Sequence, residues 1–327
     1  MAERASVFER VQLGVETTEG TAVAANRYLP SLGVVANVDI PTTRKRPAGG
    51  KLDALVVPGK EMVRANLTGG DTYDEMAYLL SSLIAYAAPA QEGSTTAYTQ
   101  AAGIAQSAPD TIKSYTIEKG SSVRAEKFSG AVVTSLQIEG TAETLSVSGT
   151  AIGKALTDGI TLTTSPTSIP LVPILPTDVS VYLDDDHGDI GTTKLTRDMK
   201  WVVNIGNRFG PVKTVDADEP SYSARVELAP DATVVLTLVK DAVGMGLLDT
   251  LRSGGTKYLR VEAISDIEAG TSIPHRLALD FALQFEAMGD EADNEGVLVN
   301  DWTGRLITDA DIPGGIEFEL TNTRSAL

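Results

Sequence analysis

Residues 275–287 read HRLALDFALQFEA, and this stretch decides the fold. Leucine or phenylalanine stands at every second position from 277 to 285, and alanine or polar residues stand between them. Alternation with period two is typical of a β-strand that has one face in a core and the other in polar surroundings. The stretch therefore predicts a long strand in a mainly β protein.

A similar pattern occurs earlier in the chain. Residues 135–139 read SLQIE and residues 282–286 read ALQFE, 147 positions later. Each pentapeptide closes a similar block, in which a strand and a short helix precede two further strands. The first block is longer, and a single loop insertion at residues 87–113 accounts for the difference. We interpret the chain as a β-rich unit that is present twice.

A segment rich in proline and threonine separates the two blocks. Residues 157–178 contain four prolines, and proline interrupts strand pairing. The sequence predicts a first β domain at residues 1–160, a linker at 161–178 and a second β domain at 179–327. Two domains also fit the usual length of roughly 100–200 residues per domain.

Each block has one predicted short helix. The first, residues 71–86, starts with the capping candidates Asp71 and Thr72 and has apolar residues at helical spacing: Met76, Leu79, Leu80, Leu83 and Ile84. The second spans residues 241–251. The predicted fold is two β-sandwich or half-barrel units, each with a short flanking α-helix.

Composition limits the class of protein. The 327 residues are 42% hydrophobic and 22% charged, which is typical of globular chains. There is no cysteine, which excludes disulfides and thiolate zinc sites. The net charge of −17 repels nucleic acid and anionic membranes from the molecule as a whole. No apolar run reaches the roughly 20 residues of a membrane helix, so we expect a soluble, unexported protein.

One motif carries a family resemblance. Residues 12–22, QLGVETTEGTA, resemble the Q-x-G-x-E-x-x-x-G-T-A opening of the major tail tube proteins of long non-contractile-tailed phages. Residues 114–119 (SYTIEK) and 128–133 (FSGAVV) resemble the middle segment of the same family. With the helix at 71–86 and the two-block layout, the resemblance spans most of the chain.

The resemblance implies a structural protein rather than an enzyme. In that family, subunits close into rings by extending their sheets, and the rings stack into a hollow tube that carries DNA. A chain with two units is expected to close the ring as a trimer with pseudo-sixfold symmetry. The implied partners are further copies of the chain, a tape-measure protein, and tail terminator and tip proteins. The implied location is the virion tail, assembled in the host cytoplasm, with double-stranded DNA passing through without specific binding and with no membrane contact.

Polar residues on the two echoing strands are candidates for the lining of the tube lumen. They are Ser135, Gln137, Glu139, Asp280, Gln284 and Glu286. An acidic wall would keep DNA phosphates from adhering, whereas lysine or arginine there would add salt-dependent attraction. The alternative is an ordinary solvent-exposed sheet face.

The loop at residues 41–51 is the basic cluster of this acidic chain. It contains Arg44, Lys45, Arg46 and Lys51. We interpret it as a ring-to-ring contact that docks on an acidic face of a neighbour. A solvent-exposed hairpin tip is the alternative. Nucleic-acid binding is disfavoured because no aromatic residue is interleaved for base stacking.

No catalytic or metal-binding motif is present. Residues 184–189, DDDHGD, lack the spacing of a calcium loop and are better explained as an acidic hairpin turn. The two histidines, His187 and His275, are not accompanied by a nucleophile motif. We therefore expect no catalytic residues, no metal and no cofactor. The alternatives are a phage decoration or receptor-binding β module that does not polymerise and, less favoured, an acidic β-sandwich hydrolase.

Overall fold

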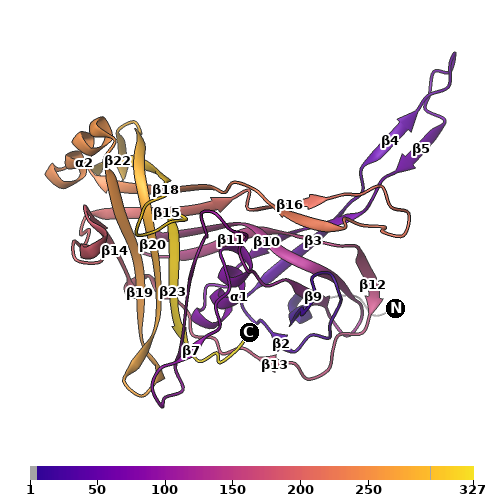
Figure 1. The fold of residues 1–327 in the computed structure, drawn as a ribbon, viewed down its shortest axis with the longest axis horizontal. Helices are drawn as coiled ribbons and strands as arrows, with labels where there is room; N and C mark the ends of the chain where they lie inside the picture. Colours follow the sequence, from indigo (N-terminus) through magenta and orange to yellow (C-terminus); the bar gives the residue numbers. More distant parts are fainter. Residues whose placement is uncertain (1–5, 295) are drawn as a thin grey trace.

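The computed structural model describes residues 6–294 and 296–327, and its fold is mainly β, as predicted (Figure 1). The first half contains η1 (Ser6–Phe8), β1 (Arg10–Val15), β2 (Arg27–Tyr28), β3 (Gly33–Asp39), β4 (Thr42–Lys45), β5 (Leu55–Pro58), β6 (Met62–Thr68), α1 (Tyr73–Leu83), β7 (Ala90–Gln91), β8 (Tyr98–Gly103), β9 (Tyr115–Gly120), β10 (Ala125–Thr141), β11 (Leu145–Gly153) and β12 (Leu156–Ile160). The second half contains β14 (Val179–Asp184), η3 (His187–Asp189), β15 (Asp198–Gly206), β16 (Phe209–Val212), β17 (Ala224–Glu227), β18 (Asp231–Val239), α2 (Ala242–Ser253), β19 (Thr256–Gly270), β20 (Ile273–Met288), β21 (Ala292–Asn294), β22 (Val297–Leu306) and β23 (Ile316–Asn322).

Eight strands form one antiparallel run that passes through both halves. Its order is β3, β6, β11, β10, β15, β18, β22, β20. The halves meet in the middle of this run, where residues 136–141 of β10 pair with residues 200–205 of β15. Four strands come from each half. The chain thus builds one sheet from two equal parts and joins them by backbone pairing at the centre.

Both halves use the same succession of elements. A strand leads into a hairpin, and a second strand, a helix, a third strand, a long strand and a closing strand follow. In the first half these are β3, β4–β5, β6, α1, β9, β10 and β11; in the second they are β15, β16–β17, β18, α2, β19, β20 and β22. The strand pairings within each half correspond as well, since β6 joins β3 to β11 just as β18 joins β15 to β22.

The register of this repeat differs from that of the sequence echo. A bulge interrupts β10 between Val133 and Ser135 opposite β11, and another interrupts β20 between Phe285 and Ala287 opposite β22. Matching the bulges makes Leu136 equivalent to Met288, 152 positions later. The echoing pentapeptides, 147 positions apart, are therefore five residues out of structural register. The extra residue at each bulge restores the alternation of faces, so glutamines 137 and 284 still lie on the same side of the sheet.

The predicted helices are present, but they differ in burial. Thr72 caps α1 and its side chain accepts a hydrogen bond from the Glu75 backbone N–H at 3.2 Å. Every residue of α1 is buried, including those of its polar face. Asp241 caps α2, where only Gly244 and Leu247 are buried. In Figure 1, α1 lies in the middle of the molecule and α2 at one end.

Residues 87–113, predicted as a surface loop, contain two strands. β7 and β8 pair with each other, and residues 98–103 of β8 pair with residues 317–322 of β23 in the second half. The insertion thus provides a second connection between the halves. This pairing joins segments more than 200 residues apart, so no local pattern could have indicated it.

The Pro/Thr-rich segment lies against the first half. It contains β13 (Thr167–Ser168), which pairs in parallel with β2, and η2 (Pro176–Asp178). Ile169 and Ile174 are 2% and 4% exposed. Neither helix in the described part of the chain combines the length and apolarity that crossing a membrane requires.

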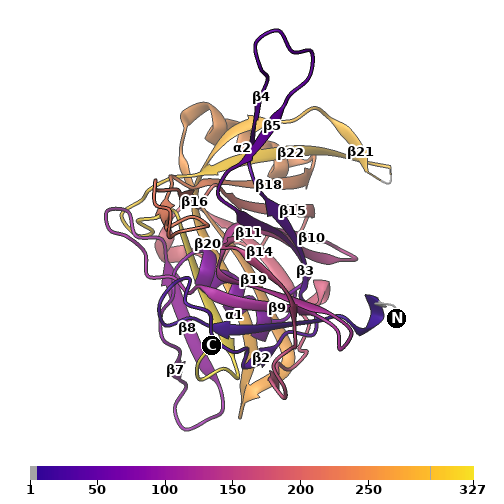
Figure 2. The same cartoon turned by 90° about the vertical axis from the view of Figure 1, so that its right-hand side faces the viewer.

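Two hairpin arms extend from corresponding places in the two halves. β4 and β5 pair with each other, as do β16 and β17. Figures 1 and 2 both show the β4–β5 arm projecting beyond the rest of the chain. The β16–β17 arm instead lies against the first half, as described below.

Candidate functional site

One face of the eight-strand run is polar across its full width. Gln137 lies opposite Ser148 on β11 and opposite Asn204 on β15. The same row of opposing residues continues through both halves, in the order Gly33, Thr68, Ser148, Gln137, Asn204, Thr233, Arg305 and Gln284. The other face carries the core, with Leu136 and Ile205 each 2% exposed. We call the first of these surfaces the polar face.

The polar face brings together most of the lumen candidates. Ser135, Gln137 and Glu139 are half-exposed and alternate with buried residues of β10. Gln284 lies in the same cross-strand row as Gln137, and exposed Glu286 is ion-paired to Arg305 of that row at 2.8 Å. Two segments that are distant in the sequence therefore contribute to one surface.

Asp280 lies in a different part of the fold. Here β20 pairs with β19 and β23 rather than with β22. Both carboxylate oxygens of Asp280 accept hydrogen bonds from the Arg260 guanidinium, each at 2.7 Å. These charge-assisted bonds also raise the pKa of Arg260 above its ordinary value. Asp280 is thus a partner in a cross-strand ion pair at some distance from the other five candidates.

The cations of the polar face are neutralised by neighbouring acids. Lys200 lies 2.8 Å from Glu139 across the β10–β15 pairing. Arg305 contacts Asp231 at 3.2 Å as well as Glu286, and Arg64 contacts Asp39 at 2.8 Å. Each of these three basic residues therefore has an acidic partner. The face presents hydroxyls, amides and paired charges, with little to attract a phosphate backbone.

The basic cluster lies on the free arm. Arg44, Lys45, Arg46 and Lys51 are all exposed on β4 or in the turn that follows it. Arg44 has a weak contact with Asp53 at 3.8 Å, and both side chains are largely solvent-accessible. The arm also exposes apolar side chains, with Leu52 81% and Val56 53% exposed. Charged and apolar groups displayed together on a projecting hairpin suit a contact with another protein surface.

The corresponding arm of the second half is packed against the first half. The Tyr222 hydroxyl donates to the Gly130 carbonyl at 2.9 Å. Arg208, 3% exposed, donates to the Leu83 carbonyl at 3.2 Å and forms a buried ion pair with Asp110. These contacts show how an arm of this type binds to a neighbouring unit.

The motif at residues 12–22 has a structural role in the fold. Gly14 is required because a Cβ atom there would lie 2.5 Å from the Ala24 carbonyl oxygen. Glu16, 5% exposed, accepts hydrogen bonds from the Gly20 backbone N–H at 2.7 Å and from the Gly130 backbone N–H at 2.8 Å. It also accepts from the hydroxyls of Ser114 and Thr116. The opening and middle segments of the resemblance therefore meet at one buried carboxylate.

The acidic turn at 184–189 is organised by Asp184, as expected for a structural turn. Its carboxylate accepts hydrogen bonds from the backbone N–H groups of Gly191 and Thr193, each at 2.9 Å. Burial alone would raise the pKa of Asp184, but hydrogen bonds from Thr193, Thr192 and Gly191 outweigh it and lower the pKa below its ordinary value. Among residues 6–294 and 296–327, no three histidine, aspartate or glutamate residues are grouped to hold a metal ion.

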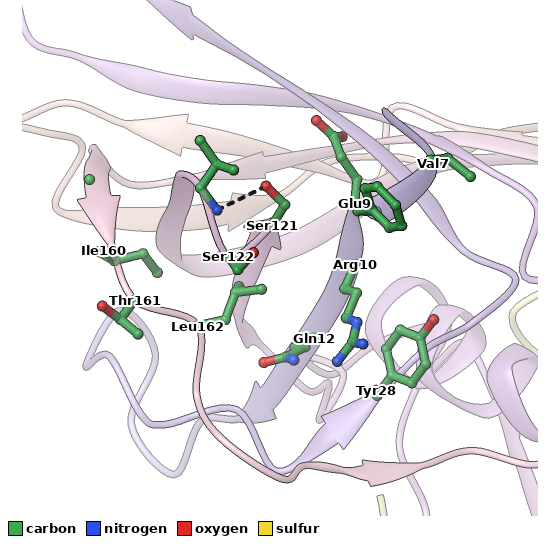
Figure 3. Close-up of a pocket in the computed structure, with 13 residues that line it drawn as sticks. Val7, Glu9, Arg10, Gln12, Tyr28, Ser121, Ser122, Ile160, Thr161 and Leu162 are labelled. Atoms are coloured by element: carbon green, nitrogen blue, oxygen red, sulfur yellow. Dashed lines mark hydrogen bonds between the residues drawn. The ribbon is translucent and has the colours of Figure 1, made fainter. Parts of the chain in front are cut away.

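A recess lies beside the start of β1. Its volume is about 710 Å³, and Val7, Tyr28, Ser121 and Ile160 are among the residues that line it (Figure 3). Its lining includes Glu9, 3.8 Å from Lys119, and Arg10, which lies over the Tyr28 ring.

The two histidines also have structural surroundings. His275 is 2% exposed, and its Nδ1 atom lies 2.9 Å from the Ile267 carbonyl oxygen. Its Nε2 atom is 3.7 Å from the buried carboxylate of Asp74, which also accepts a hydrogen bond from Arg324. His187 lies in the acidic turn, with its ring against Tyr258.

Comparison with known proteins identified a weak structural similarity. No protein-family model matches the sequence, and no curated protein matches it. Among solved structures, the chain is similar to the SPP1 phage tail tube determined by solid-state NMR and cryo-EM. The TM-score is 0.30 with 14% sequence identity, and the match covers 46% of this chain and 79% of that one.

Proposed function

We propose that this chain is a structural phage tail tube protein, three copies of which close a ring with pseudo-sixfold symmetry. The observation that carries the proposal is the joining of two equivalent units by the β10–β15 pairing, while the corresponding outer edges, β3 and residues 288–293, pair with nothing on that side in the described chain. A surface that repeats head to tail generates a closed ring when the rotation allows closure. Unpaired strand edges otherwise promote aggregation, so a protein that keeps them has a use for them.

The number of strands supports a channel. Eight strands per chain give 24 in a ring of three. A barrel of about eight strands has an interior filled by side chains, whereas barrels of about 16 strands or more enclose an aqueous channel. A single copy is therefore too small to enclose a duplex, and three copies are sufficient.

The polar face is the proposed lumen wall. The apolar side of the eight-strand run is covered by α1 and by further strands of the same chain, so the polar face is the one left open. Closing the sheet with those layers outside places Ser135, Gln137, Glu139, Gln284 and Glu286 inside. Asp280 belongs to the same proposed acidic surface, although its part of β20 pairs with β19 and β23 rather than with β22. Paired charges and uncharged polar groups let DNA pass without specific binding.

The β4–β5 arm is the proposed stacking element. Its counterpart is already used within the chain, whereas Arg44, Lys45, Arg46 and Lys51 project away from it. The ring surface as a whole is acidic, because each chain carries a net charge of −17. Docking a basic arm on the acidic face of the next ring would join rings into a tube by complementary charge.

This function involves no reaction and no cofactor. The proposed partners are further copies of the chain, a tape-measure protein inside the tube, and tail terminator and tip proteins at its ends. The proposed location is the virion tail, after assembly in the host cytoplasm. A decoration or receptor-binding module would share the β architecture but would stay monomeric.

Negative-stain electron microscopy combined with light scattering tests the proposal. The purified chain is expected to give rings about three chains in mass and hollow tubes built from them. Compact monomers over a range of protein and salt concentrations would overturn the proposal and favour the module that does not polymerise.

A further inference from the structure

The pairing inside the chain predicts the register of the pairing between chains. At the internal seam, Leu136 lies opposite Ile205 and Gly140 lies opposite Trp201. These residues belong to β10 and β15. In the succession of elements, β20 together with β21 is equivalent to β10. In the same way, β3 is equivalent to β15.

The equivalence can be given residue by residue. The matched bulges make Leu136 equivalent to Met288. One extra residue follows Met288, since Met288 lies opposite Trp302 and Ala292 lies opposite Val299, so Gly140 is equivalent to Asp293. Each arm starts three residues after its preceding strand ends, at Thr42 after Asp39 and at Phe209 after Gly206. Ile205 and Trp201 are therefore equivalent to Val38 and Val34, 167 positions earlier.

Both outer edges are open over the residues concerned. β19 pairs with β20 up to Gln284 and no further, which leaves that side of residues 288–293 unpaired among the described residues. β3 pairs with β6 alone, so its other side is open as well. The two edges run antiparallel when matched, as β10 and β15 do.

Burial differs between the seam and the open edges in the way that a missing partner predicts. Leu136 and Ile205 are both 2% exposed, and each lies opposite the other. Their equivalents Met288 and Val38 are 37% and 45% exposed, although both are apolar. A second copy placed across this edge would bring them together and remove apolar surface from water.

The exposure of the two helices and the small residues at the seam also indicate that a partner is missing at the outer edges. α1 is enclosed by the first half and by β20 and β23 of the second half, whereas α2 leaves Val243 62% exposed. At the internal seam, a Cβ atom on Gly140 would lie 2.4 Å from the Trp201 ring. The outer edge has the smaller valine at 34 where the seam has tryptophan, so Asp293 can carry a side chain where the seam requires glycine.

We propose that residues 288–293 of one copy pair antiparallel with residues 33–38 of a second copy, with Met288 opposite Val38 and Asp293 opposite Val34. The proposal rests on the ring-forming function above and gives its contact a register. The partner is a second copy of this chain, because the internal seam already shows the complementary pair of surfaces joined.

Cysteine trapping tests this register, and the natural chain has no cysteine to interfere. Residues directly opposite in antiparallel strands have Cα atoms about 4.5–5.5 Å apart, within the range of roughly 4.4–6.8 Å that a disulfide needs. The test variant combines Val38→Cys with Met288→Cys. The matched control combines Val38→Cys with Ala292→Cys, which shifts one site four residues, about 13 Å, along the strand. Gln137→Cys with Asn204→Cys is the positive control, because these residues lie opposite each other within one chain.

The expected product after mild oxidation is a covalent trimer of the test variant, at least about tenfold more abundant than in the matched control, since the control distance exceeds disulfide reach. Tubes that form normally without this product, or with more product in the control, would overturn the register while leaving the tube function intact. Monomers in the microscope with no product between chains would overturn the proposed function, and the seam with it.

Discussion

The Glu16 Oε1 atom accepts a hydrogen bond from the backbone N–H of Gly130 at 2.8 Å, and this bond ties the opening segment of the chain to β10. Three further donors, on Gly20, Ser114 and Thr116, converge on the same carboxylate. Gly130 in turn accepts a hydrogen bond from Tyr222 of the second half. One buried carboxylate therefore organises a point where three distant segments meet.

Replacing Glu16 with alanine is expected to lower the free energy of unfolding by about 3 kcal/mol. The physical reason is that several buried donors lose their acceptor, and each unsatisfied buried group costs roughly 1–3 kcal/mol before the site relaxes. Glu16→Gln, which keeps one acceptor oxygen, should have a smaller effect. Urea unfolding followed by circular dichroism measures both. The control is Glu143→Ala at an exposed turn, expected to change stability by less than about 0.5 kcal/mol. Equal losses for the two alanine variants would contradict this role.

Asp184 is expected to make stability depend on pH in the acidic range. Its pKa is lowered in the folded chain, so its contribution is present above the pKa of the unfolded state and is lost as pH falls through the lower folded value. Asp184→Asn should therefore destabilise the protein near pH 7, and the difference from the natural chain should shrink towards about pH 3. Denaturant midpoints measured across this range test the sign. A difference that stays constant or widens as pH falls would show that the charge of Asp184 does not stabilise the turn.

Reversing the charge of the β4–β5 arm should separate ring formation from stacking. Arg44→Glu, Lys45→Glu and Arg46→Glu together are expected to abolish tubes and leave single rings, because an acidic arm is repelled by an acidic ring surface. The matched control replaces the same three residues with glutamine and should give shorter tubes. Raising the salt should weaken stacking of the natural chain, since exposed charges more than about 10 Å apart are largely screened near 0.1 M salt. Tubes of normal length from the glutamate variant would mean that stacking uses another surface.

Adding lysine to the polar face should make the tube retain DNA. Gln137→Lys with Gln284→Lys places two new cations per chain on the proposed lumen wall, which the natural sequence keeps neutral or acidic. We expect about tenfold more retention of a short labelled duplex at low salt, and a steep loss as salt rises, because phosphate contacts release counterions. Ser94→Lys with Ser107→Lys, at exposed positions of the insertion and its loop, is the control. Equal retention by both variants would place the polar face outside the channel.

Local features of the fold could be predicted from the sequence because their causes are local. The alternation at residues 275–287 gives β20, and the side chains of Thr72 and Asp241 cap the two helices by bonding to backbone within three residues. The alternation of polar and apolar residues at 135–139 was detectable in the same way. The residues of the proposed contact between copies, Val34, Val38 and Met288, were not identified from the sequence. The pattern that could have indicated them is an apolar residue at alternate positions of an edge strand. A strand buried in the core has the same pattern, so the two cannot be told apart.

The sequence alone determined the mainly β class of this protein and its two short helices, since hydrophobic period, capping and turn residues act over a few positions. Only the tertiary structure decided which strand edges meet. The two bulges set the repeat at 152 residues rather than 147, β10 takes β15 as its neighbour, and β8 joins β23 across the halves. The tertiary structure also decided that the β16–β17 arm packs against the first half and that the β4–β5 arm projects away from the chain. Pairing between distant strands depends on backbone edges that any residue except proline can supply, so composition carries almost no record of it.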